Sequence, residues 1–451
     1  MMRHLTTLIA AALLLVAGGL QAREIGSSSP ERQGFSSERL QRLSTFMDAK
    51  VADGTMVGGM GLIARNGRVV YSQTYGMADR EAGKPMTVDA IYRIYSMSKP
   101  VTSVALMMLY EEGKFSLEDP VAKYIPELAN LQIALSTAGT GVVSDGIVTR
   151  TTGESNAELV GQTRAPARQP TIHDLLTHTA GFTYGIFGNT EVDQMYRGIL
   201  MAGDIDVQEL VAKLGKLPLQ YEPGTQWHYS IANDIQGRLI EVLSGMRFGE
   251  FLQQRLFAPL DMQDSAFYVP VDKLPRLTQL YKPKGMDVFN YLSAPPSQGL
   301  DVADAWLNAG FVQQPKLEGG GGGLVSTARD YLRFSQMLLN GGELDGVQVL
   351  SPKTIQLMTT NQLGDIALGY GRGGIGFGLG VGIVLDSGRA QEISSPGTYS
   401  WGGAAGTRFW VDPKENLIGI FMVQSVPHMT SLGDDFRVLS YAAMTESQIA
   451  D

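Results

Sequence analysis

Ser96 and Lys99 form a Ser-x-x-Lys pair, and this spacing occurs nowhere else in the chain. Three residues are close to one turn of an α-helix, so the hydroxyl and the amine of such a pair share one helix face. A serine hydroxyl becomes a good nucleophile only when a neighbouring group accepts its proton. A lysine amine does this when burial or positive potential lowers its pKa from about 10.4. The pair therefore predicts an acylated serine, provided that other residues complete the site.

Histidine and tyrosine are the alternative proton acceptors. The sequence contains no Gly-x-Ser-x-Gly, which disfavours the serine–histidine arrangement of α/β-hydrolases without excluding it. A tyrosine phenol held ionised by an ammonium group is the other choice, but spacing alone does not select one of the 17 tyrosines. The five histidines are His4, His173, His178, His228 and His428.

Metal chemistry and thiol chemistry have little support in the sequence. The chain has no cysteine, which excludes thiol nucleophiles, disulfides and thiolate metal sites. It has no His-Glu-x-x-His and no His/Asp/Glu cluster with metal-ligand spacing. The glycine run at residues 319–323 lacks the Lys-Ser/Thr of a phosphate-binding loop, so we interpret it as a turn. No metal and no cofactor are expected.

Two further motifs follow the Ser-x-x-Lys pair, Tyr229-Ser230-Ile231 and then Trp401-Gly402-Gly403. In this order the three motifs resemble the active-site elements of class C β-lactamases and of β-lactamase-related esterases, particularly family VIII carboxylesterases. The resemblance covers nearly all of the chain after residue 22, except residues 136–165. Three flanking stretches carry it as well: residues 175–181, 320–328 and 401–413.

The resemblance implies a role for each side chain of the catalytic group. Ser96 would be the acylated nucleophile, and Lys99 beside it would hold Tyr229 partly ionised. Tyr229 would act as the general base in acylation and then return the proton to the leaving alcohol.

The resemblance also implies an oxyanion site on the last motif. The backbone N–H groups of Ser96 and Ala404 would hold the oxyanion, next to the substrate-binding edge formed by Trp401, Gly402 and Gly403. Glycines suit such an edge, because a substrate can approach a backbone that carries no side chains.

Two departures from the β-lactamase pattern favour esters as substrates. Ile231 stands where those enzymes have an asparagine, and Trp401 stands where they have a lysine that pairs with the substrate carboxylate. A neutral aromatic side chain there favours uncharged esters, so the resemblance implies a carboxylesterase with a possible weak β-lactamase side activity. The rivals are a β-lactamase or D-Ala-type cell-wall peptidase, an acyltransferase, and, more remotely, a non-catalytic cell-wall binding module.

The N-terminus has the pattern of a signal peptide. Arg3 and His4 precede an apolar run over residues 5–20, and Ala22 offers a cleavage site, so residues 1–22 are expected to be removed. The alternative is an uncleaved N-terminal anchor. A bacterial periplasmic or secreted protein is expected, without stable membrane insertion after cleavage, and the lack of disulfides fits the periplasm.

Composition describes an ordinary globular protein. The 451 residues are 44% hydrophobic and 18% charged, with a net charge of −9 and no basic stripe, which argues against a nucleic-acid partner. The expected ligand is a small-molecule ester, and the oligomeric state is left open.

The order of predicted elements is helix and strands, a long helical block, then strands and a helix. This order predicts an α+β fold, an antiparallel sheet flanked by helices with an inserted mainly helical domain. The resemblance names the fold as β-lactamase/transpeptidase-like. Residues 23–95 and 319–451 would form the sheet domain and residues 96–318 the helical domain, with the active site at their junction.

Several local patterns predict individual elements. Ser36 is expected to cap a helix whose apolar face includes Leu40, Leu43 and Met47. Asn66-Gly67 lies between two strand-like runs and predicts a hairpin. Thr171 and Asp174 resemble a capping box, and a last helix is expected over residues 435–444.

The alternation of glycine and apolar residues over residues 376–385 predicts a single strand, with a glycine face that another element approaches closely. Residues 136–165 are expected to form an inserted loop or small hairpin. His178 and Asp234 are interpreted as structural groups. Four aromatic residues are predicted to line an acyl pocket, with core packing as an equal alternative: Phe182, Tyr184, Phe187 and Trp306.

Overall fold

The structure is a computed structural model that describes residues 24–135, 143–144, 147–148, 161–200, 204–286, 299–369 and 373–448. The predicted leader, residues 1–22, lies outside this part, as does most of the segment 136–165. Two short strands of that segment, Val143–Ser144 (β6) and Ile147–Val148 (β7), pair as a hairpin, one of the two forms expected for it. Within the described ranges, no helix is long and apolar enough to span a bilayer.

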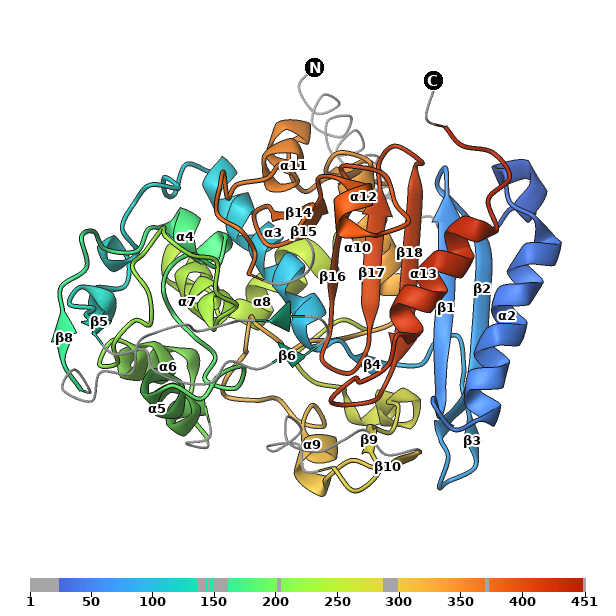
Figure 1. Ribbon diagram of the computed structural model, residues 1–451, viewed down its shortest axis with the longest axis horizontal. Helices are drawn as coiled ribbons and strands as arrows, with labels where there is room; N and C mark the ends of the chain where they lie inside the picture. Colours follow the sequence, from blue (N-terminus) through green and yellow to red (C-terminus); the bar gives the residue numbers. More distant parts are fainter. Residues whose placement is uncertain are drawn as a thin grey trace, which may run out of the picture.

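An eight-stranded antiparallel sheet forms the right-hand part of the molecule in Figure 1. The strand order β14-β15-β16-β17-β18-β1-β2-β3 places a late strand beside an early one, so both ends of the chain build one sheet. The strands are β1 (Gly58–Arg65), β2 (Arg68–Asp79), β3 (Lys84–Pro85), β14 (Ile375–Phe377), β15 (Gly382–Val384), β16 (Tyr399–Gly402), β17 (Arg408–Asp412) and β18 (Leu417–Val423).

The turn between β1 and β2 confirms the predicted hairpin. Asn66 and Gly67 have φ angles of 53° and 68°, as the two central residues of a type I′ turn require. This turn twists in the same sense as the strands that it joins, so the sequence signal and the sheet geometry agree.

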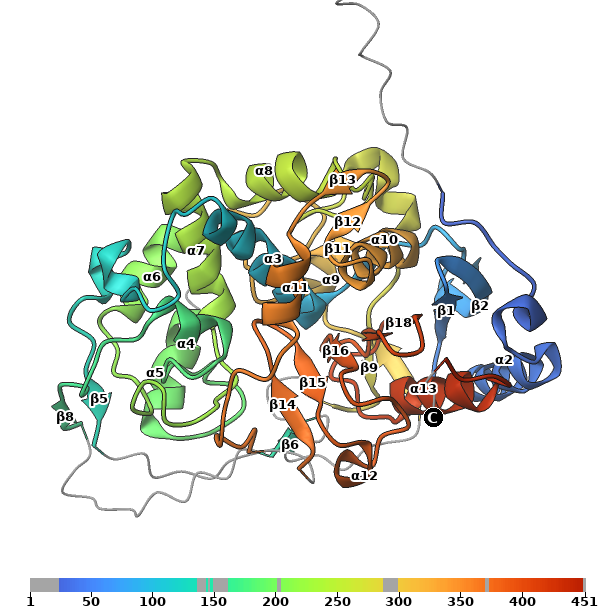
Figure 2. The ribbon, with the colours of Figure 1, turned by 90° about the horizontal axis from the view of Figure 1, so that it is seen from above.

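Helices cover both faces of the sheet, and a second group of helices packs beside it. Figure 2 shows α2 and α13 on one side of the sheet and α10 on the other. The helices are α2 (Ser37–Ala52), α3 (Ser98–Glu111), α4 (Ile172–Leu176), α5 (Glu191–Leu200), α6 (Val207–Leu214), α7 (Ala232–Ser244), α8 (Phe248–Leu252), α9 (Ala305–Ala309), α10 (Ala328–Leu339), α11 (Pro352–Met358), α12 (Ser387–Ala390) and α13 (Leu432–Ala442). The last helix therefore begins and ends slightly before the predicted residues 435–444.

Local sequence signals start two of these helices as predicted. The Ser36 hydroxyl accepts the N–H of Arg39 at 3.3 Å and caps α2, whose Leu40, Leu43 and Met47 are buried against the sheet. Thr171 and Asp174 form a reciprocal capping box at the start of α4. Such caps satisfy backbone donors that a helix terminus leaves unpaired.

Helix α3 lies at the junction between the sheet and the group of helices α4 to α8 (Figures 1 and 2). It packs against α7 on one side. Just before it, the short strand β4 (Tyr92–Arg93) pairs with β11 (Val325–Ser326), which follows the glycine run 319–323. This pairing brings the start of α3 beside a segment far away in the sequence.

The prediction of a single strand over residues 376–385 is wrong. The chain instead makes the antiparallel pair β14 and β15, joined by a turn in which the Gly378 N–H donates to the Val381 carbonyl at 2.8 Å. Gly380 in this turn has φ of 97°, which a side chain would disfavour. A polarity pattern of period two continues through such a turn, so it does not reveal where a strand reverses.

The close approach predicted for the glycine face is confirmed. A Cβ atom on Gly382 would lie 3.4 Å from the Trp401 ring, and one on Gly380 would lie 2.3 Å from Ser103 Oγ. Gly380 therefore makes room for helix α3, whereas the Trp401 ring lies at ordinary van der Waals contact distance from Gly382.

The aromatic packing of α13 on the sheet generates a stability prediction. The Phe436 ring is fully buried, with its centroid 5.2 Å from that of Phe421 and 5.9 Å from that of Trp410. Phe436→Ala should lower the free energy of unfolding by about 3–5 kcal/mol, because it leaves a cavity. Val438→Ala, at a 46% exposed position of the same helix, should change it by less than about 0.5 kcal/mol. Urea denaturation measures both, and equal losses would contradict the packing argument.

Candidate active site

Ser96 is presented at the N-terminal end of α3. It lies in a 3₁₀ turn, Tyr95–Met97, that leads directly into the helix, and its side chain is half-buried. Tyr95 has φ of 41°, a region that non-glycine residues rarely occupy and that often marks functional sites. The Ser98 hydroxyl accepts the Leu324 N–H at 3.1 Å and ties this turn to the segment after the glycine run.

Lys99 lies one turn along from Ser96, as the spacing predicts, and is 1% exposed. Its Nζ donates to Ser96 Oγ at 3.1 Å and to the Gly321 carbonyl at 2.5 Å. Burial lowers the pKa of Lys99 to about 7, although the attraction of Asp234 opposes this change. An amine with this pKa is partly neutral at pH 7 and is able to accept the serine proton.

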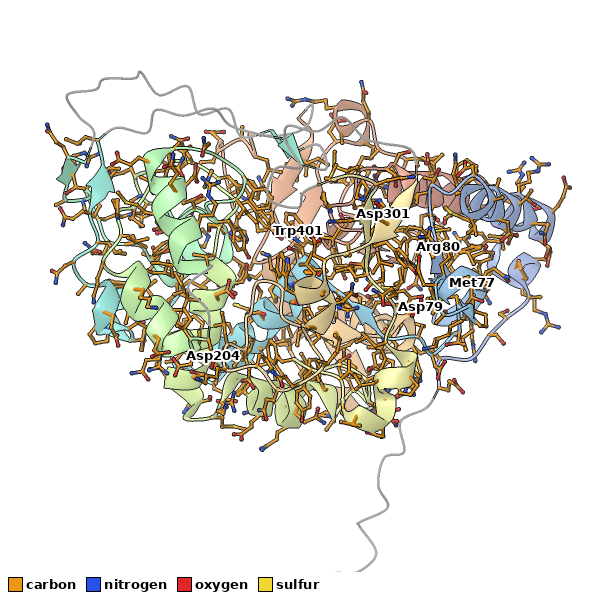
Figure 3. All side chains as sticks on the ribbon, turned by 90° about the horizontal axis from the view of Figure 1, so that it is seen from below. Met77, Asp79, Arg80, Asp204, Asp301 and Trp401 are labelled. Atoms are coloured by element: carbon orange, nitrogen blue, oxygen red, sulfur yellow. The ribbon has the colours of Figure 1, made fainter. Side chains whose placement is uncertain are left out.

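Tyr229 lies just before α7, and its ring faces the amine. The distance from Lys99 Nζ to the ring centroid is 4.6 Å for Tyr229 and 5.0 Å for Tyr184. The indole N–H of Trp401 donates to the Tyr229 hydroxyl at 3.4 Å. The structure therefore brings together the side chains of all three sequence motifs, at the boundary between the helices and the sheet where Figure 3 shows Trp401.

The turn after β16 carries Ala404, one of the two expected oxyanion donors. Gly403 donates its N–H to the Thr407 carbonyl at 2.7 Å, and Ala404 at the tip is exposed. Among the described residues, no acceptor is bonded to the N–H groups of Ser96 and Ala404, so both donors are available. A Cβ atom on Gly403 would lie 2.3 Å from the Ile94 carbonyl, which explains the glycine at this position.

An aromatic cluster surrounds Tyr229. Trp227 and Phe377 are buried in it, and the sequence analysis missed both. The sequence could have indicated Trp227, because it lies two residues before Tyr229. It could not have indicated Phe377, which belongs to a distant hairpin. The centroid of the Trp227 ring lies 6.0 Å from that of Tyr229, and the centroid of Phe377 lies 5.3 Å from that of Trp401.

The four residues predicted to line an acyl pocket take different places. Tyr184 and Phe187 are partly exposed, and their ring centroids lie 5.4 Å and 5.5 Å from that of Tyr229. Phe182 is buried in the main core, so core packing, the alternative stated for these residues, holds for it. Trp306 is 55% exposed on α9. Tyr184 and Phe187 are therefore the two that belong to the wall around Tyr229.

His178 packs directly on the tyrosine motif. Its ring centroid lies 5.0 Å from that of Tyr229, and its Nδ1 accepts the Ser230 N–H at 3.3 Å. Burial and the charge of Lys99 lower the pKa of His178 well below its usual value, so the ring is neutral. This arrangement is consistent with a structural role. Ile231, the departure from the β-lactamase pattern, is buried in the core.

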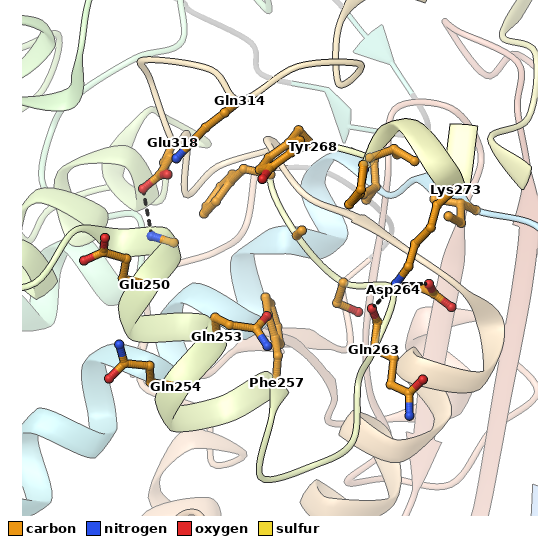
Figure 4. A pocket seen from close by; sticks show the side chains of 18 residues that line it. Glu250, Gln253, Gln254, Phe257, Gln263, Asp264, Tyr268, Lys273, Gln314 and Glu318 are labelled. Atoms are coloured by element: carbon orange, nitrogen blue, oxygen red, sulfur yellow. Dashed lines mark hydrogen bonds and ion pairs between the residues drawn. The ribbon is translucent and has the colours of Figure 1, made fainter. Parts of the chain in front are cut away.

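The described residues form a pocket away from Ser96 but no group of side chains suited to a metal ion. No group of three or more His, Cys, Asp or Glu side chains suited to a metal ion occurs among the described residues. Figure 4 shows a separate pocket of about 400 Å³, whose described lining does not include Ser96. Two of its carboxylates are paired within the protein: Glu318 accepts the Gly249 N–H at 2.7 Å, and Asp264 pairs with Arg276 at 2.5 Å.

Comparison with known proteins agrees with this geometry. The sequence profile of the family described as Beta-lactamase matches residues 43–443. Protein Rv1367c of Mycobacterium tuberculosis is 32% identical over 387 residues, covering 84% of this chain and 88% of that protein. Esterase EstB of Burkholderia gladioli is 26% identical over 378 residues, covering 82% of this chain and 86% of that protein.

A solved structure shows the same fold. The structure titled "EstCE1, a hydrolase with promiscuous acyltransferase activity" covers 90% of this chain and 98% of its own, with a TM-score of 0.69 and 23% identity. The fold is α+β and β-lactamase/transpeptidase-like, as predicted. With its profile match over most of the chain and its motifs gathered around Ser96, the chain belongs to the Beta-lactamase family of serine hydrolases.

Proposed function

We propose that the chain is a carboxylesterase that cleaves uncharged esters through an acyl-enzyme on Ser96. The observation that carries this proposal is the hydrogen bond between Lys99 Nζ and Ser96 Oγ, because the amine is buried and has a lowered pKa. The esterase among the relatives supports the same class of substrate.

In the proposed acylation step, Ser96 Oγ attacks the ester carbonyl and its proton passes to the Lys99–Tyr229 pair. Lys99 Nζ is the first acceptor, since it already contacts the hydroxyl. The N–H groups of Ser96 and Ala404 stabilise the oxyanion. The C–O bond then breaks, Tyr229 gives its hydroxyl proton to the leaving alcohol and takes up the proton held by Lys99, and water releases the acid from Ser96 by the reverse proton path.

The surroundings of Tyr229 support an uncharged substrate. Trp401 occupies the position at which β-lactamases carry a cationic side chain. Two more aromatic rings lie nearby, Phe377 beside Trp401 and Phe187 beside Tyr229. A substrate carboxylate would therefore lose its partner there, whereas an apolar acyl group would gain contact area.

Acyl transfer is a second candidate function. The aromatic wall around Tyr229 would favour an organic alcohol over water as the acceptor of the acyl group, and a structural relative is titled as having promiscuous acyltransferase activity. Product analysis with an added alcohol measures the share of transfer in the same assay.

Replacing the nucleophile tests the proposal directly. Ser96→Ala should lower nitrophenol release from p-nitrophenyl butyrate by at least roughly 10³-fold, because no acyl-enzyme forms. A fluorophosphonate should label Ser96 in the wild type, as read by mass spectrometry. The Ser98→Ala variant should still be labelled on Ser96, because the Ser98 hydroxyl is bonded to the Leu324 N–H and is not the expected nucleophile. Full activity of Ser96→Ala, or a label on another residue, would overturn the assignment.

The pH dependence should follow the proton on Lys99. Since the protonated amine cannot accept a proton, kcat/KM should rise with pH through about 7 and then level off. Lys99→Arg keeps a cation at every accessible pH and should lose roughly 10²–10⁴-fold in kcat/KM. Lys353→Arg, an exposed lysine, is the matched control. A profile that is flat between pH 6 and pH 8, ~1 unit on each side of this value, would contradict the role of Lys99.

Substrate preference separates the esterase from the β-lactamase. The value of kcat/KM for p-nitrophenyl butyrate should exceed that for nitrocefin by roughly 10²-fold, because Trp401 stands where β-lactamases carry the lysine that pairs with the substrate carboxylate. Parallel assays of one preparation, with Ser96→Ala as the blank, measure the ratio. The opposite order would assign the chain to the β-lactamase rival.

A further inference from the structure

The glycine run 319–323 packs against the first turn of α7. A Cβ atom on Gly320 would lie 2.3 Å from the Asn233 carbonyl. One on Gly321 would lie 2.3 Å from the Tyr184 hydroxyl and 2.7 Å from Asp234 Oδ2. Gly320 therefore lies against backbone and Gly321 against the polar ends of two side chains, and a side chain at either position would force its neighbours to move.

Gly321 connects Asp234 to the proposed base. Its N–H donates to Asp234 Oδ1 at 3.3 Å, and its carbonyl accepts from Lys99 Nζ at 2.5 Å. Lys99 Nζ in turn contacts Ser96 Oγ. A continuous chain of hydrogen bonds and one residue of backbone therefore runs from the carboxylate to the nucleophile.

Burying the Asp234 carboxylate at this position costs desolvation free energy. It is 7% exposed, and it takes no part in the ion pairs formed by the described residues. A buried carboxylate without a direct cationic partner costs stability and is often retained for a functional reason. Burial raises the pKa of Asp234, and the positive charge of Lys99 opposes this change.

The other titratable groups around this pair are Tyr184, Tyr229 and His178. Burial raises the pKa of Tyr184 well above its usual value and lowers that of His178 well below, so both are neutral near pH 7. Lys99 is therefore the cation whose charge Asp234 balances.

We infer that Asp234 is a positioning residue that acts on Ser96 through Gly321 and Lys99. It holds the Gly321 backbone that fixes the amine against the serine hydroxyl, and its negative charge keeps the proton on Lys99 up to a higher pH. This inference rests on the proposed reaction at Ser96 and goes beyond the structural role expected for Asp234 from the sequence.

The sign of the electrostatic effect gives a specific test. Asp234→Asn keeps the shape of the side chain and removes its charge, so the ammonium form of Lys99 loses stabilisation. On the acid side of the pH–rate profile, the pH at which the rate falls (the acid limb) should then move down by about one pH unit.

The measurement is the rate at which a fluorophosphonate labels Ser96 between about pH 5 and pH 9, a range that brackets the ordinary titration of a perturbed lysine. This rate reports the serine and its base without an ester substrate. Glu241→Gln removes the same charge from the same helix and is the matched control, with no change expected. Gly321→Ala leaves the charge in place but disturbs the backbone link, so it should slow labelling about 10-fold without moving the limb.

The outcomes are distinguishable. A limb that moves only in Asp234→Asn supports the inference, whereas a folded Asp234→Asn variant with an unmoved limb overturns it. If Ser96 is labelled with these profiles but no ester is hydrolysed, the esterase proposal fails and the inference stands. If Ser96 is not labelled in the wild type, both fail.

Discussion

The position of the Lys99 amine is the constraint on which the rest of the site depends. Helix α3 brings the amine to Ser96 by local geometry alone, but a buried amine must find partners in place of water. Those partners come from elsewhere: a carbonyl 222 positions along the chain and the faces of two tyrosine rings. The helical region and the sheet must therefore pack together before the base exists.

Glycine makes this packing possible at two places. At residues 320 and 321 the chain lies against the start of α7 and the Tyr184 hydroxyl, and the Gly321 carbonyl accepts from Lys99. At Gly403 the turn after β16 lies against the Ile94 carbonyl, so this turn comes close to the segment that leads to Ser96. In both cases the absent Cβ atom allows two distant segments to form one site.

Several features were predictable from the sequence because they depend on near neighbours. The hairpin at Asn66-Gly67 and the caps at Ser36 and Thr171 follow from local backbone chemistry. The strand predicted over residues 376–385 failed, because polarity alternation carries no information about the reversal at Gly380. Trp227, Phe377 and Asp234 were missed as neighbours of the site for a related reason: nothing local shows which distant ring or amine they will contact.

The sequence by itself determined the Ser-x-x-Lys pair on one helix face, the order of the three motifs and the aromatic residue at position 401, since these depend on residue types and short spacings. Only the tertiary structure decided that Lys99 is dry enough to lose its proton near pH 7, that Trp401 reaches the Tyr229 hydroxyl, and that Asp234 joins them through Gly321. The physical reason is that desolvation and charge–charge interaction depend on distances across the whole fold.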